Sequence, residues 1–318
     1  MKPRYGILST SSIAPRFIAA VREAGAGEIV ALSSRTLEKA KTKASEWNIP
    51  TAYGDHNALL ADPGINTVYI STVNSEHYRW AKAALLAGKH VVCEKPCTTT
   101  PTETAALFAL AREKDLFFME AEKMLFLPTM LEVRRRIEAG DLGPIRMIEM
   151  SHSFAPTYND WVFNEALGGG PLLSSGIYCM QLILWLFGDI AAIRGVKNST
   201  PEGVEQQYVL TGQTENGVLF TCKNSTMVKL DSTARIYGEK GFIEIPEYWK
   251  ARKATIHITD QDPQIVEFPC AHELIYEAKH IAECLEKGLR TSPVVTEEIS
   301  VKGIAALAAV KATWRENG

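Results

Sequence analysis

A glutamate, a lysine and a proline follow directly on the apolar run Val91–Cys93, in the stretch HVVCEKP. The run is typical of the end of a buried strand, where charged side chains are rarely placed without a partner. A lysine ammonium beside a substrate hydroxyl favours its deprotonation, which the oxidation of an alcohol requires. Glu94 and Lys95 are therefore candidate active-site residues, although the residues alone favour a surface ion pair.

A glycine-rich segment, ALGGGPLLSSGIY at residues 166–178, is the second candidate. Its last residue, Tyr178, is a phenol that could donate and accept a proton, or simply a packed helix tyrosine. Trp161 lies just before the segment and could stack on a substrate ring or pack in the core. Lys123 could bring a cation to the substrate pocket, or pair with its neighbour Glu122.

The first 120 residues or so alternate short apolar runs with helical patterns. Such alternation predicts βαβ units and a parallel sheet, and nearly continuous apolar strands indicate a sheet covered on both faces. In such a sheet, ligands bind beyond the carboxyl ends of the strands. The expected strands are 4–8, 27–34, 66–72, 89–94 and 115–120, and the expected helices are 13–24, 36–47, 75–87 and 101–114.

The loop after the first strand is the place where a dinucleotide phosphate would bind. If Ala14 is aligned with the end of the fingerprint G-x-G-x-x-G/A, serines stand at both preceding glycine positions, so the pattern is weak. Serine hydroxyls and a helix N-terminus can still bind phosphate oxygens. The candidate cofactor residues are Ser9, Thr10, Ser11, Ser12 and Ile13; a plain strand–helix turn is the alternative.

Two further strand ends carry polar residues. Ser34 and Arg35 follow the second strand, where an acidic residue would select NAD; a hydroxyl and a guanidinium suit a 2′-phosphate and favour NADP over NAD. A surface arginine is the alternative. Thr72, Asn74 and His77 follow the next long strand and could contact the cofactor. Equally, Asn74 could cap the following helix and His77 could be a surface histidine.

The second half of the chain is rich in β-strand patterns, with Asn216-Gly217 and Lys240-Gly241 as hairpin turns. We therefore expect an α/β protein: residues 1–123 as a dinucleotide-binding domain, and residues 124–318 as an α+β domain on a large, mostly antiparallel open sheet. Two helices, 271–287 and 297–315, are expected in that second domain. They are too few to cover the second face of the sheet, so we expect a homodimer or larger homo-oligomer.

The composition excludes several classes of protein. The 318 residues are 46% hydrophobic and 22% charged, as in globular proteins, and the net charge of -3 gives no reason to expect nucleic acid or membrane as partner. No run approaches 18 apolar residues, so we expect no membrane span and a cytoplasmic location. Cys93 and Cys97 lack a second ligand pair, so we expect buried reduced thiols and no metal site.

Over essentially its whole length, the chain resembles the glucose–fructose oxidoreductase / inositol dehydrogenase (Gfo/Idh/MocA) family of nicotinamide oxidoreductases. The resemblance is carried by YGILSTSSIA, SSRTLEKA, VNSEHYRWAKAALLAGKHVVCEKP, FFMEAEKMLFLP, GDLGPIR, ALGGGPLLSSGIY and CLEKGLRTSPV. The E-K-P element is the most specific of these. The branch of dimeric dihydrodiol dehydrogenase and NADP-dependent xylose dehydrogenase is the most similar.

The resemblance implies roles for the candidate residues. Lys95 would reach the nicotinamide ribose and the substrate hydroxyl, next to a commonly cis Lys–Pro bond, and Glu94 would hold Lys95 or the ribose. Tyr178 would be the acid/base. Ser174 stands where the family has a substrate-binding aspartate, and Leu125 where relatives often have an arginine, so sugar specificity does not transfer.

Taken with this resemblance, the residues predict an NADP-dependent oxidoreductase. It would transfer a hydride between the nicotinamide and a secondary alcohol or ketone of a sugar, polyol or cyclic diol. A non-catalytic regulatory protein that binds NADP or a sugar on the same fold is the alternative.

Overall fold

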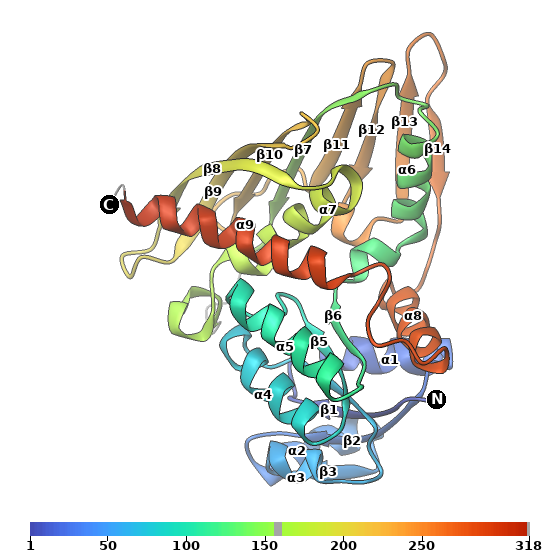
Figure 1. Ribbon diagram of the computed structural model, residues 1–318, viewed down its shortest axis with the longest axis vertical. Helices are drawn as coiled ribbons and strands as arrows, with labels where there is room; N and C mark the ends of the chain where they lie inside the picture. Colours follow the sequence, from blue (N-terminus) through green and yellow to red (C-terminus); the bar gives the residue numbers. More distant parts are fainter. Residues whose placement is uncertain (156–160, 317–318) are drawn as a thin grey trace. The chain divides into compact units, whose positions relative to one another are not determined.

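A computed structural model describes residues 1–155 and 161–316 of the chain (Figure 1). They form two compact units. The first unit comprises Met1–Glu122 and His272–Ser300, and the second comprises Lys123–Ala271 and Val301–Gly318.

The first unit is built on a six-stranded parallel sheet in the order β3-β2-β1-β4-β5-β6. Its strands are almost wholly buried, because helices cover both faces, and this explains their continuous apolar runs. The strands are β1 (Arg4–Leu8), β2 (Glu28–Ser33), β3 (Thr51–Tyr53), β4 (Thr67–Ile70), β5 (His90–Glu94) and β6 (Phe118–Ala121). The helices are α1 (Ala14–Ala24), α2 (Leu37–Glu46), α3 (His56–Leu60), α4 (Asn74–Leu86), α5 (Pro101–Glu113) and α8 (Leu274–Glu286).

The helix α8 corrects the expected domain boundary. Its segment was expected in the second domain, but it packs beside α1 in the first unit (Figure 1). The buried residues Leu274, Ala278, Ile281 and Leu285 form one helical face, and Arg16 of α1 pairs with Glu273 at its start. A helix that returns to an earlier domain leaves no mark in the local pattern.

The second unit is built on an eight-stranded sheet in the order β14-β13-β12-β11-β7-β10-β9-β8. All neighbours are antiparallel except β7 and β10, which are parallel. The two expected glycine turns do connect β9 to β10 and β11 to β12. The strands are β7 (Ile145–Ser153), β8 (Ile190–Ser199), β9 (Glu205–Thr214), β10 (Leu219–Ser225), β11 (Thr233–Gly238), β12 (Gly241–Pro246), β13 (Lys253–Ile258) and β14 (Gln264–Glu267).

Helices α6 (Pro128–Glu138) and α7 (Ile177–Phe187), with the C-terminal part of α9 (Glu297–Glu316), lie on one side of this sheet (Figure 1). Strand residues such as Ile148, Phe220 and Ile236, together with Ile243 of β12, are buried in the core of this unit. The other face is exposed: Val196 and Val209 are register partners there, at 71% and 49% exposure.

A long apolar helical segment was not expected, because no run in the sequence approaches 18 apolar residues. Glu165–Phe187 is long and apolar enough to cross a membrane by length and composition alone. However, 83% of its apolar window is buried inside the protein, as in the core helix of a globular unit. All six cysteines are free, five of them buried.

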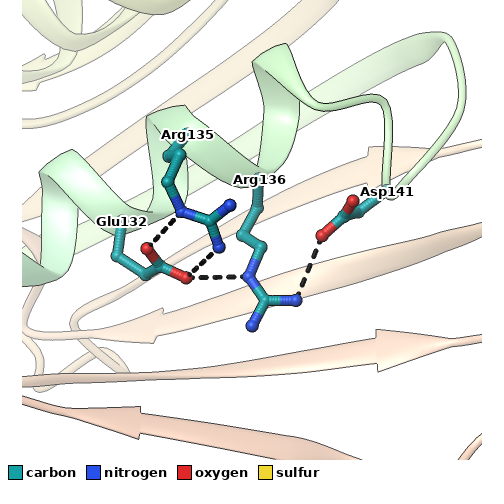
Figure 2. Close-up of polar contacts among 4 residues, drawn as sticks. All are labelled: Glu132, Arg135, Arg136 and Asp141. Carbon is teal, nitrogen blue, oxygen red and sulfur yellow. Dashed lines mark hydrogen bonds and ion pairs between the residues drawn. The ribbon is translucent and has the colours of Figure 1, made fainter.

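An ion-pair network fixes the C-terminal end of α6 (Figure 2). Glu132 accepts from both Nε and Nη2 of Arg135, at 2.7 Å each, and from Nε of Arg136 at 2.8 Å. Arg136 also reaches Asp141, beyond the end of the helix, at 3.1 Å. The two guanidinium groups lower the pKa of Glu132 to about 2.

Candidate active site

The loop between β1 and α1 carries Ser9, Thr10, Ser11, Ser12 and Ile13, as expected. Ser9 has a φ of 102°, a conformation that glycine adopts freely and other residues rarely. Serine therefore occupies a backbone position of the kind that usually requires glycine. The Ser11 hydroxyl donates to Ser71 Oγ, at 2.8 Å, which ties this loop to the end of β4. The loop thus fits a phosphate beside the start of α1.

The end of β2 carries the residues expected to select the cofactor. Ser34 is buried and its N–H donates to Tyr53 O, whereas Arg35 is exposed. Ser33 Oγ lies 2.8 Å from His56 Nδ1 at the start of α3. Burial lowers the pKa of His56, and Arg35 acts in the same direction. His56 therefore supports this strand end through its contact with Ser33, and Arg35 is the positively charged residue at the same strand end.

The E-K-P turn lies at the end of β5, and the Lys95–Pro96 bond is cis, as the resemblance implied. Its surroundings anchor it firmly. The buried Glu120 carboxylate accepts the N–H of Cys97 at 2.7 Å, just after the turn. The Tyr69 hydroxyl donates to Glu94, the first residue of the E-K-P turn.

His77 anchors the same turn from a third side, which the sequence did not predict. His77 is 1% exposed, so it is not a surface histidine, and its contact with the cofactor stays a prediction. Its Nδ1 lies 2.8 Å from Pro96 O, and its Nε2 lies 3.1 Å from Thr72 O. His77 thus connects the carboxyl ends of β4 and β5. Burial lowers its pKa.

Asn74 and Thr72 also differ from expectation in detail. Asn74 is buried as the first residue of α4, and the cap position is Val73, with no side-chain capping bond. Thr72 Oγ1 is buried with no hydrogen-bond partner among the described residues, whereas its carbonyl faces His77. An unsatisfied hydroxyl at a strand end is a suitable contact for a ligand.

In the second unit, the glycine cluster leads into a π-helix, Leu172–Gly176, that continues as α7. Such single π turns are frequent at functional sites. The buried Glu205 carboxylate accepts the N–H of Leu172 at 3.0 Å. A Cβ at Gly170, whose φ is 108°, would lie 2.2 Å from that carboxylate. Glycine is therefore required where the chain turns into the helix that carries Tyr178.

Tyr178 is the second residue of α7, 7% exposed, and its partner is Lys123. Lys123 Nζ donates to the phenol oxygen at 2.6 Å and lies 4.7 Å from the ring centre. Lys123 belongs to the short helix η1 (Lys123–Phe126) and is 8% exposed. Neither of the two roles expected for Lys123 anticipated this bond.

Two residues of this unit were missed by the sequence analysis. His152 and Asn224 are register partners on β7 and β10, and both stand at core-facing positions where apolar residues alternate. Asn224 Nδ2 donates to Ser175 Oγ at 2.7 Å and lies 3.1 Å from His152 Nδ1. Ser175 in turn donates to Pro171 O. Polar residues in an alternating apolar strand were the available signal.

The remaining two substrate candidates lie near this π-helix in sequence. Ser174 is a half-buried residue of the π-helix itself. Trp161 begins the short helix η2 (Trp161–Phe163), and its carbonyl lies close to Gly169. Both residues are half-buried, and the hydroxyl oxygen of Ser174 is buried, so contact with a substrate stays a prediction.

Comparison with known proteins finds two family models, one matching within each of the two compact units. Residues 4–122 match the "Oxidoreductase family, NAD-binding Rossmann fold" of GFO/IDH/MocA, and residues 130–244 match the "GFO/IDH/MocA C-terminal domain". The chain is 33% identical over 317 residues to trans-1,2-dihydrobenzene-1,2-diol dehydrogenase of Mus musculus, covering 93% of this chain and 92% of that protein. The protein of that name from Homo sapiens is 32% identical over 310 residues, with coverage of 93% and 92%.

Solved structures share the fold. Aldose–aldose oxidoreductase from Caulobacter crescentus superposes with a TM-score of 0.90 at 26% identity, covering 100% of this chain and 99% of that one. The 3-ketoreductase KijD10 from Actinomadura kijaniata, solved with NADP, gives a TM-score of 0.90 at 23% identity, covering 98% of each chain. The second likeness speaks to the fold alone.

Proposed function

Because this chain belongs to the GFO/IDH/MocA family of oxidoreductases, we propose that it is an NADP-dependent dehydrogenase. Its substrate class is a secondary alcohol, or the matching ketone, of a sugar, polyol or cyclic diol. The relatives named above include diol and sugar oxidoreductases, which supports this class.

The observation that carries the proposal is the anchoring of the E-K-P turn. Glu120, His77 and Tyr69 come from three different elements, and each bonds a residue on or beside the turn. An ordinary surface lysine would need no such support. The anchors fix the main chain from which Lys95 projects, and a fixed position is what catalysis at a reacting oxygen requires.

In the proposed reaction, the side chains manage the proton. Lys95 binds the reacting oxygen of the substrate and stabilises negative charge on it. Tyr178 accepts the hydroxyl proton during oxidation and returns it during reduction. NADP, when bound, supplies the two-electron oxidant. The loop Ser9–Ile13 would hold its pyrophosphate, and Ser34 with Arg35 its 2′-phosphate.

Turnover with NADP and a panel of sugars, polyols and cyclic diols is the first test. Single variants Lys95→Met and Tyr178→Phe should each lower kcat by roughly 10²–10⁴-fold while NADP affinity changes little, because Tyr178 transfers the proton and Lys95 stabilises the oxygen that loses it. The double variant should be little worse than the poorer single variant, because residues that act as a unit are not additive. Full activity in Lys95→Met would refute the proposed role of the turn.

A wild-type protein that binds NADP and turns over nothing in the panel would favour the non-catalytic alternative. NADP selection is tested separately by fluorescence titration of NADPH and NADH. We expect at least tenfold tighter binding of NADPH, which needs only ~1.4 kcal/mol and one charge-assisted contact. Arg35→Asp should reverse the order, with Arg22→Asp, another exposed arginine of the first unit, as the matched control. Equal affinities in the wild type would overturn the assignment.

A further inference from the structure

Lys123 and Tyr178 stand 55 residues apart in the chain and meet in a buried hydrogen bond of 2.6 Å within the second unit. Both side chains are less than one-tenth exposed. A buried ammonium is costly unless it is paired or hydrogen-bonded. A neutral phenol is a modest partner for it, whereas a phenolate would be a full one. The hydrogen bond from the Lys123 ammonium to the phenol oxygen therefore favours the phenolate form of Tyr178.

The other titratable groups on elements that contact η1 already have partners of their own. These elements are α6, α7 and the short helix η5 (Tyr248–Lys250). Lys123 is a charged group of the second unit that donates directly to the Tyr178 oxygen. The pairs are Glu132 with Arg135 and Arg136, Glu138 with Arg134, Lys250 with Glu247, and Cys179 Sγ with the Tyr248 hydroxyl at 3.2 Å.

We propose that Lys123 is the positioning residue of Tyr178: it holds the phenol oxygen in place and stabilises the phenolate, so that Tyr178 acts as the base. This inference rests on the proposed function and assigns its proton transfer and its charge stabilisation to different residues. The phenolate takes the proton as the substrate O–H bond breaks and the Tyr178 O–H bond forms, and NADP takes the electron pair and hydrogen from the carbon. Lys123 keeps its hydrogen bond to the Tyr178 oxygen throughout, and Lys95 stabilises the substrate oxygen.

The first measurement needs no turnover. Phenolate absorbance is titrated with alkali in the wild type and in Tyr178→Phe, and the difference isolates Tyr178 from the other tyrosines. The same difference is taken between Lys123→Met and the double variant Lys123→Met/Tyr178→Phe. Burial raises the pKa of four other tyrosines, which keeps their titration away from the lower pH range: Tyr5, Tyr69, Tyr208 and Tyr248.

We expect the Tyr178 difference signal to appear at a pH lower by about one unit or more when Lys123 is present. Lys123→Arg should restore most of that displacement, because it keeps the charge. Lys250→Met removes a neighbouring lysine that already pairs with Glu247, and should leave the signal where it is. Coincident curves for the wild type and Lys123→Met would overturn the inference.

The second measurement is the dependence of kcat/KM on pH. In Lys123→Met the acidic limb should move to higher pH in the same direction as the absorbance signal, whereas Lys95→Met should lower kcat without moving that limb. A limb that stays in place in Lys123→Met would also overturn the inference. If the wild type shows no turnover at all, the proposed function fails, but the absorbance titration still decides the Lys123–Tyr178 pairing.

Discussion

Replacing Ser9 by glycine should stabilise the protein, although glycine substitutions usually do the reverse. Ser9 holds a φ of 102°, where a residue with a Cβ is strained by roughly 1–3 kcal/mol. Glycine relieves that strain but adds about 0.4–1 kcal/mol of conformational entropy to the unfolded chain. The Ser9 N–H bond to Ser33 O, at 3.2 Å, is kept. We therefore expect Ser9→Gly to raise the free energy of unfolding by about 1 kcal/mol.

The matched control is Ser11→Gly, two residues along the same loop. Ser11 donates its hydroxyl to Ser71 Oγ at 2.8 Å, a bond worth about 0.5–1.5 kcal/mol that glycine cannot make. With the added entropy of the unfolded chain, the protein should lose about 1–2 kcal/mol. Urea unfolding of both variants, followed by fluorescence, measures the two changes. If Ser9→Gly were as destabilising as Ser11→Gly, the strain argument would be wrong.

Three other outcomes are expected. Since Arg135 and Arg136 lower the pKa of Glu132 from 4.5 to about 2, its contribution to stability is present above pH 4.5 and lost as pH falls towards 2. The unfolding free energies of the wild type and Glu132→Gln should therefore differ by about 1 kcal/mol at pH 7, after allowance for solvent screening, and converge in acid; a constant gap would contradict this. Gly170→Ala should lower the Tm by about 3 °C, because the new Cβ meets the Glu205 carboxylate and φ is 108°, costing about 2 kcal/mol; an unchanged Tm would contradict this, since the strain at this φ remains even if Glu205 moves. Light scattering at micromolar protein should give a dimer or larger, through the open face of the second unit's sheet, and a mass near 35 kDa would exclude it.

The sequence predicted the long elements of the first unit because each one is specified locally. The strands β1, β2, β4, β5 and β6 are continuous apolar runs, and their order along the chain leaves few arrangements for a parallel sheet. The elements β3 and α3 were missed, since three and five residues carry too little pattern to separate a strand or helix from a loop.

The helix α6 was missed for another reason. It is rich in glutamate and arginine, which pair on its exposed side, and Thr129, Met130 and Val133 are its only buried residues among those described. Most of its residues are charged or polar, so no apolar run in the sequence marks the helix.

The positions of the candidate residues were predicted best at the carboxyl ends of the strands. Position along the sheet follows from topology, so the residues of the E-K-P turn and of the loop Ser9–Ile13 could be assigned from the sequence. The anchors could not. His77 and Glu120 act through hydrogen bonds to the main chain near the turn, and no spacing in the sequence encodes such a contact.

The departures from the family pattern have a common physical form. Where the fingerprint has glycine, Ser9 has a φ of 102°, which a residue with a Cβ adopts only with strain. Where relatives often carry an arginine, this chain has Leu125, but Lys123, two residues earlier, places a cation on Tyr178. In each case we expect the local requirement, a backbone angle or a positive charge, to be met by another residue type or another position. A sequence pattern records residue types at fixed positions, so it registers these as losses. For this reason we expect the protein to be an active enzyme rather than a relic of one, and turnover with NADP is the measurement on which that expectation depends.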